Sequence, residues 1–291
     1  MTASTAAIKA RNELLIGVLD EMPEEDDRRR LITICEKSIP DNVNFVDGCV
    51  LVSVLAQIGI IDLHDGNDCI DLDMHFMGEF GWWFKTNDEG RITFLAITKW
   101  PDTDPFDLPA IVAQLERLTH IEVENCRSLP PELTILMHLQ TLEFTRCSDL
   151  LNNIPVQMQL KNLKKIHLTG CIFQSSSPFL VWMIVQLPNL EILELRCMEN
   201  FGTNCILDAL RTYVGDVSFR DNLKKIKMVF CKLDETHLET LLFDILPKFP
   251  NIFSLDLNFN RIESVQSIAD RLKKDNDSTY SFVSTLISSK I

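Results

Sequence analysis

Apolar residues recur at three fixed positions in seven consecutive stretches of the chain, beginning at Ile92. With the first apolar residue of each stretch taken as position one, the other two stand at positions four and six. Position one holds Ile92, Leu118, Leu139, Leu163, Leu190, Leu223 and Ile252, position four holds Leu95, Ile121, Leu142, Ile166, Leu193, Ile226 and Leu255, and position six holds Ile97, Val123, Phe144, Leu168, Leu195, Met228 and Leu257. Because positions four and six alternate with mostly polar residues, each stretch predicts a short β-strand with one buried face.

Position nine of the same stretches holds Trp100, Cys126, Cys147, Cys171, Met198, Cys231 and Asn260. The resulting spacing, L-x-x-L-x-L-x-x-N/C, resembles the leucine-rich repeat family, whose unit is a short strand followed by a helix or a looser return. The resemblance implies an α/β fold, a leucine-rich repeat solenoid with a parallel inner sheet and a mixed helix and loop outer face. We expect the four cysteines to be buried, structural thiols that meet the backbone of the turn leaving each strand.

The segments between the strands differ in character along the chain. Pro130, Pro131 and Pro155 break the early ones, so these predict short, irregular returns. The later ones predict helices over residues 178–186, 204–213, 234–246 and 264–274, with Asp234 and Ser264 as N-caps. After Lys274 the chain becomes a polar tail.

The first 90 residues predict an acidic, mostly helical cap on the array of about seven repeats that fills residues 91–291. Helices are expected over residues 6–19 and 24–37, and a third from Asp47 as its N-cap to Gln57, stopped by Gly59. Residues 81–97, GWWFKTNDEGRITFLAI, resemble the end of the amino-terminal cap in plant-type repeats. That resemblance implies a hairpin turning at residues 88–90, but the pair of cysteines of the family's cap is missing at residues 82–86.

The formal net charge of −14 is unevenly distributed. Residues 1–90 carry 7 Lys and Arg against 18 Asp and Glu, a balance of −11, whereas 21 basic and 24 acidic residues in the rest give only −3. General nucleic-acid binding needs a basic surface, so this balance argues against it. The longest apolar run, residues 49–61, is interrupted by polar residues and is too short to span a membrane.

Localisation is predicted from the first residues and from the cysteines. The opening MTASTAAIKARNELL lacks a secretory signal, and the nine cysteines are an odd number, so we expect a cytoplasmic protein with reduced thiols. Cys197 and Cys205 flank one return. A disulfide between them is an alternative, but the sequence favours a reduced pair. One glycosylation sequon at Asn276 instead indicates a secreted or cell-surface protein.

No catalytic motif is found: the sequence has no phosphate loop, dinucleotide fingerprint, nucleophile elbow or zinc-protease signature. His120 and His167 fall on outward strand positions and are interpreted as solvated surface histidines. The aspartates of residues 62–73 form an oxygen-rich loop, but it lacks the glycine and closing glutamate of an EF-hand, which favours a solvated acidic loop. We therefore expect no enzyme activity, no cofactor and no metal.

The sequence therefore predicts a monomeric, non-catalytic protein-interaction module that binds another protein through the open face of its sheet. The candidate partner-binding residues are Glu122, Glu143, His167, Glu194, Lys227, Phe230, Phe253 and Phe259. Opposite charges on neighbouring strands indicate an alternative, in which the charges of this surface neutralise one another. In a second alternative, residues 280–286 fold over the phenylalanines and cover them. Two other functions stay open: a secreted or cell-surface recognition domain of the plant type, and an enzyme with a noncontiguous site.

Overall fold

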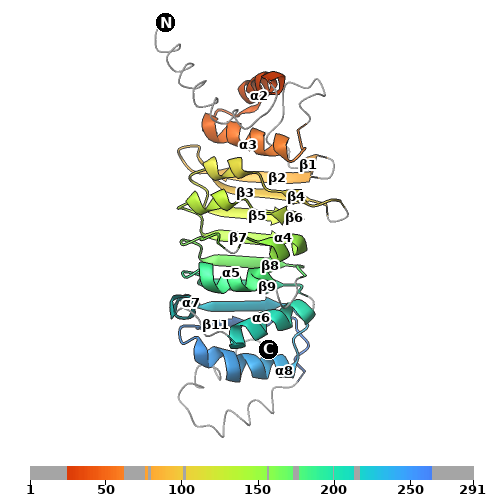
Figure 1. The fold of residues 1–291 in the computed structure, drawn as a ribbon, viewed down its shortest axis with the longest axis vertical. Helices are drawn as coiled ribbons and strands as arrows, with labels where there is room; N and C mark the ends of the chain where they lie inside the picture. Colours follow the sequence, from red (N-terminus) through yellow and green to blue (C-terminus); the bar gives the residue numbers. More distant parts are fainter. Residues whose placement is uncertain are drawn as a thin grey trace.

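The protein is an α/β structure built on one long, mostly parallel sheet (Figure 1). The computed structural model describes residues 25–61, 76–77, 80–100, 103–155, 157–172, 177–198, 200–212 and 217–263. Nine strands join in the order β1-β2-β3-β5-β7-β8-β9-β10-β11. Their bounds are Phe76–Met77, Phe80–Thr86, Ile92–Lys99, His120–Glu124, Thr141–Thr145, Lys165–Thr169, Ile192–Arg196, Lys225–Val229 and Ser254–Asp256. From β3 to β11 all neighbours are parallel, whereas β1 and β2 are antiparallel additions at one end.

The strand register predicted from the sequence is confirmed. Leu95, Ile121, Leu142, Ile166, Leu193, Ile226 and Leu255, the position-four residues, are direct partners across seven consecutive strands. The first six are 0–1% exposed and belong to one continuous core, whereas Leu255 on the last strand is only partly buried. Because side chains alternate along a strand, this register places position five on the opposite face, away from the core.

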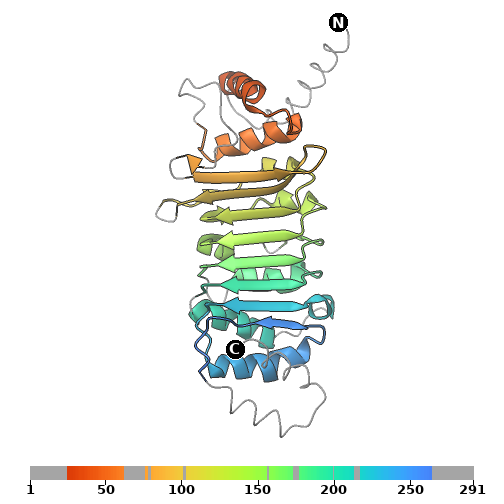
Figure 2. The ribbon, with the colours of Figure 1, turned by 180° about the vertical axis from the view of Figure 1, so that it is seen from behind.

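The connections cover one face of the sheet and leave the other face uncovered (Figures 1 and 2). Early connections are short 3-10 turns, η1 (Ala110–Gln114) and η2 (Pro131–Ile135), and the short helix α4 (Ser148–Asn153). Later ones are α5 (Pro178–Gln186), α6 (Asn200–Thr212) and α8 (Glu235–Glu239), as predicted. Asp234 is the N-cap of α8, and the segment continues as a π-helical turn, η3 (Thr240–Ile245), and a 3-10 turn, η4 (Leu246–Lys248).

Helix α7 (Val217–Asn222) was not predicted, nor was the small parallel pair formed by β4 (Phe106–Asp107) and β6 (Cys126–Ser128). Predictions for residues 6–19, 62–73 and 264–274, for Asn276 and for the segment 280–286 lie outside the described residues. None of the helices in the described ranges is long and apolar enough to cross a membrane.

Helices α2 (Glu25–Ser38) and α3 (Phe45–Gln57) lie at the amino-terminal end of the sheet (Figure 1). The predicted N-cap of α3 was wrong, because Asn44 caps the helix and Asp47 lies inside its first turn. Asp47 is completely buried and accepts hydrogen bonds from Arg91 Nε at 3.0 Å and from the Ile92 amide at 2.7 Å. A carboxylate on α3 thus holds the turn that joins β2 to β3. These two antiparallel strands form the hairpin predicted from the sequence.

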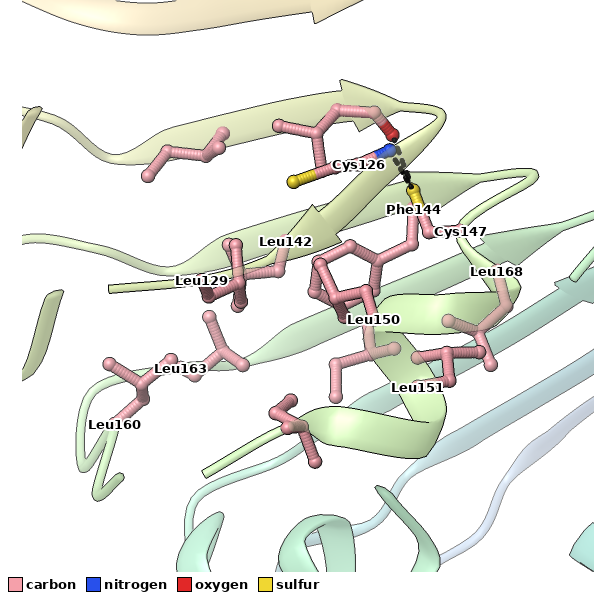
Figure 3. Close-up of a cluster of buried hydrophobic side chains, with 14 of the residues drawn as sticks. Cys126, Leu129, Leu142, Phe144, Cys147, Leu150, Leu151, Leu160, Leu163 and Leu168 are labelled. Carbon is pink, nitrogen blue, oxygen red and sulfur yellow. Dashed lines mark hydrogen bonds between the residues drawn. The ribbon is translucent and has the colours of Figure 1, made fainter. Parts of the chain in front are cut away.

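The four position-nine cysteines, Cys126, Cys147, Cys171 and Cys231, are buried, as predicted. Figure 3 shows two of them, Cys126 and Cys147. The Cys147 thiol lies 3.4 Å from the Val123 carbonyl and 3.2 Å from the Thr145 carbonyl, and it accepts from the Cys126 amide at 3.4 Å. Asn260 takes the same place in the last stretch, where it donates to Met228 O at 2.6 Å and accepts from Cys231 N at 2.9 Å. Position nine therefore links adjacent turns through their backbones.

Replacing Cys147 with leucine should lower the free energy of unfolding by about 1–3 kcal/mol, because the larger side chain overpacks a site that is 1% exposed. The change also removes the thiol that joins two neighbouring turns. Chemical denaturation measures the difference, and Cys197→Ser, at an exposed cysteine, is the matched control with little expected effect. Unchanged stability in the leucine variant would contradict a structural role.

Candidate functional site

The uncovered face of the sheet brings five predicted site residues into one row. Glu122, Glu143, His167, Glu194 and Lys227 are direct partners on β5, β7, β8, β9 and β10. All five occupy position five, which alternation places opposite the core. We call this row, together with the charged side chains that contact it, the polar face.

Glu143 is the centre of hydrogen bonding on the polar face. Its carboxylate accepts from His167 Nδ1 at 2.9 Å and from Lys165 Nζ at 3.0 Å. Burial by itself raises the pKa of Glu143, but these two hydrogen bonds outweigh it and lower the pKa to about 2. Glu143 is therefore ionised at neutral pH and already paired.

Glu194 is almost buried, whereas the sequence predicted it on the open face of the sheet. Its side chain is only 4% exposed and lies beneath three cations. Arg196 Nη2 is 2.7 Å from its carboxylate, and Lys165 and Lys227 are each 3.5 Å away. The pKa of Glu194 is lowered, since hydrogen bonding to Arg196 and these charges outweigh the opposing effect of burial.

The charges of the polar face are therefore largely compensated within the sheet. Lys224 and Glu191, which precede β10 and β9, also form an ion pair at 3.0 Å. Exposed pairs of this kind contribute little, about 0–1 kcal/mol each, and they leave few charges free to attract a partner. The alternative of a self-neutralising surface describes this part of the face better than a charged recognition patch does.

His120 and His167 are not the solvated histidines that the sequence suggested. The His167 ring contacts Glu143 Oε2 through Nδ1 at 2.9 Å and the Thr169 hydroxyl through Nε2 at 3.1 Å. The His120 ring packs on Phe94, with ring centroids 4.6 Å apart, and burial lowers its pKa. Its Nε2 atom is buried and has no hydrogen-bond partner among the described residues, although Glu143 Oε1 lies 3.5 Å away.

Glu122 differs from the other glutamates of the row. Among the described residues it forms no hydrogen bond or ion pair, yet it is half-buried. Burial, and then the neighbouring charge of Glu143, raises the pKa of its carboxyl group. Within the part of the chain that the structure describes, Glu122 thus keeps a carboxylate that no hydrogen-bond donor or cation occupies.

The three predicted phenylalanines do not form one patch. Phe230 and Phe259 stack face to face in adjacent turns, with ring centroids 4.6 Å apart and planes inclined by 6°. They are 50% and 71% exposed. Phe253, 63% exposed, stands before β11 whereas Phe259 follows it, and among the described residues Phe253 has no ring contact with the other two. We call Phe230 and Phe259 the aromatic pair.

Both members of the aromatic pair have left-handed backbone conformations, with φ of 56° at Phe230 and 60° at Phe259. The same position eight is left-handed in Asn125, Arg146, Gly170 and Cys197. The turn therefore requires this conformation, which glycine and asparagine adopt readily and which a bulky side chain rarely does. This conformation could not be predicted from the sequence, because an aromatic residue argues against a positive φ.

The enzyme alternative predicted perturbed ionisable groups gathered in a pocket. The groups with shifted pKa values on the polar face lie on an open sheet. A surface pocket is lined by residues within 134–139 and 159–162, and it contains none of these groups.

All eight cysteines in the described ranges, Cys197 and Cys205 among them, are free thiols. No model of a known protein family matches the chain, and no curated protein matches it.

Proposed function

We propose that the protein is a non-catalytic interaction module of the leucine-rich repeat type and that it binds a partner protein through the aromatic pair. The repeat assignment is supported by the spacing of apolar positions one, four and six and by the alignment of successive strands. The scaffold is shared by many functions, so the proposed role rests on the surface.

The observation that carries the proposal is the exposed, stacked pair Phe230 and Phe259. Each ring occupies a turn position where a non-glycine residue costs about 1–3 kcal/mol of backbone strain. Asn125 fills the equivalent position at lower expected cost, so the turn alone does not require an aromatic residue. Exposed aromatic rings of this kind anchor protein interfaces, because they bury a large apolar area with few rotatable bonds.

The polar face has a secondary role in this proposal. Most of its charges are already paired, as Lys165 with Glu143 and Lys227 with Glu194 show, so it contributes orientation and a polar rim more than binding energy. A partner seated on the aromatic pair would contact β10 and β11 first. Lys227 is therefore the predicted row residue best placed to touch it.

The alternative of a self-cap predicts that residues 280–286 cover the same rings, and the double variant Phe230→Ala, Phe259→Ala separates the two. Affinity capture with the full-length protein from native extract, followed by quantitative comparison of the recovered proteins, measures binding, and thermal unfolding measures stability. We expect partner recovery to fall at least tenfold while the melting temperature stays unchanged, because both rings are solvent-exposed.

The control is Val181→Ala, Val185→Ala on α5, which removes two similarly exposed apolar side chains, 58% and 57%, from the helical side of the sheet. Its partner recovery should equal that of the parent protein. A large fall in melting temperature of the phenylalanine variant, corresponding to the roughly 3–5 kcal/mol of a buried Phe→Ala change, would instead mean that the rings are core. Equal recovery with both variants would refute the aromatic pair as the anchor.

The secreted or cell-surface alternative makes a different prediction about cysteines and glycan. It requires paired thiols and a glycan at Asn276, whereas the eight described cysteines are free in this structure. Thiol titration of protein isolated under native conditions discriminates between the two locations.

A further inference from the structure

Three side chains from two adjacent strands of the polar face converge, and His120 Nε2 lies 3.5 Å from Glu143 Oε1. His120 and Glu122 project from β5, and Glu143 projects from the facing position of β7. One nitrogen of the histidine and one oxygen of each carboxylate all lie within 4.8 Å of one another. Two ligands of one tetrahedral ion stand about 3.4 Å apart, so modest side-chain rotations would bring the three atoms into a common coordination sphere.

Two of these three groups have binding capacity that the described residues leave unused. His120 Nε2 is buried and makes no hydrogen bond, which is costly for a polar atom out of contact with water. Glu122 makes no hydrogen bond or ion pair among the described residues, although it is half-buried beside a second carboxylate. Both costs would be relieved by one cation placed between them.

We propose that His120, Glu122 and Glu143 form a binding site for a divalent transition-metal ion of the zinc class. One imidazole and two carboxylates are ligands that zinc accepts, and a site with three protein ligands leaves the fourth position to water or to an incoming group. The site lies toward the amino-terminal end of the polar face and does not include the aromatic pair, so it stands independently of the proposed function.

The surroundings of Glu143 provide both support and opposition. His167 Nδ1 lies within hydrogen-bond distance of Glu143 Oε2, at 2.9 Å. This contact orients the carboxylate, as hydrogen-bond partners of metal ligands do in metal sites. Lys165 opposes the ion, because its Nζ lies 3.0 Å from Glu143 Oε1. The same Nζ is 3.5 Å from Glu194 Oε2, so it keeps a carboxylate partner when an ion takes its place. Lys85, whose Nζ lies 5.0 Å from the Phe94 ring centre, adds a second nearby cation.

Competition between the full-length protein and a chromophoric chelator for Zn²⁺ at neutral pH tests the site. The parent carries Cys69→Ser and Cys197→Ser, because Cys197 is exposed and Cys69 lies outside the described residues. We expect one zinc per chain. Loss of a direct ligand in His120→Ala or Glu122→Gln should weaken binding by more than the roughly 10–100-fold that an outer-shell change costs.

Two further variants make the test specific. Lys165→Gln removes the competing ammonium group and should tighten zinc binding several-fold. If zinc were instead held by general attraction to acidic side chains, this single substitution would change the measured affinity little. His138→Ala, in an exposed turn, should leave binding unchanged. The proposal is overturned when the parent binds no zinc, when Glu122→Gln binds as the parent does, or when Lys165→Gln weakens binding. Glu122→Gln is nearly isosteric and decides the matter even if His120→Ala does not fold.

Discussion

Replacing Asp47 with asparagine should lower the free energy of unfolding by about 3 kcal/mol. The carboxylate is fully buried on α3 and accepts from both Arg91 Nε and the Ile92 amide. Asparagine has the same shape but loses the charge and turns one acceptor into a donor that faces the guanidinium. Breaking a buried ion pair costs roughly 3–5 kcal/mol, and we expect the lower end because the Arg91 side chain is 22% exposed and can be partly solvated.

The matched control makes the same chemical change at an exposed ion pair. Asp107 contacts Arg127 Nη2 at 2.5 Å, but both side chains are 51% exposed, so Asp107→Asn should have a much smaller effect on stability. Urea denaturation of the two variants beside the parent measures the difference. Equal, small losses would show that the contact between α3 and the β2–β3 turn does not hold the amino-terminal end of the sheet.

The sheet could be predicted from the sequence because its determinants are local. A strand that buries alternate residues repeats apolar side chains every second position, and Ile121, Leu142 and Ile166 appear at the same place in each stretch. Register follows from that pattern, since a shift of one residue would turn the whole apolar set to solvent. The buried position-nine cysteines followed from the same spacing.

The parts that could not be predicted depend on residues far apart in the chain. Asp47 looked like an N-cap because its true partner, Arg91, is 44 residues away, and nothing near Asp47 in sequence indicates a buried ion pair. His120, Glu122 and Glu143 converge because β5 pairs with β7, which places Glu122 opposite Glu143. The imidazole of His120, two residues earlier on β5, reaches Glu143 diagonally across the two strands. The left-handed conformation of Phe230 conflicts with its local preference, so only the turn geometry shows it.

A chain that begins at Arg91 should fail to give a soluble, folded monomer. The first 90 residues supply β2, whose pairing with β3 covers the edge of the sheet, and α3, which packs on η1. Six apolar residues of α3 are at most 1% exposed: Cys49, Val50, Leu51, Val52, Val54 and Leu55. Each fully buried aliphatic side chain contributes about 1.5–3 kcal/mol, so their loss rivals the whole stability of a typical domain, roughly 5–15 kcal/mol.

The exposed edge of β3 adds association to this loss of stability, because it would present unpaired backbone groups beside uncovered apolar residues. Size-exclusion chromatography and thermal unfolding of the shortened chain should therefore show aggregates and no cooperative transition. Leu55→Asp in the full-length chain separates packing from chain length, since it places a charge in the same buried contact and should also abolish cooperative unfolding. A soluble shortened monomer that melts like the parent would show that the first 90 residues are a dispensable unit and that the core closes at β3 without them.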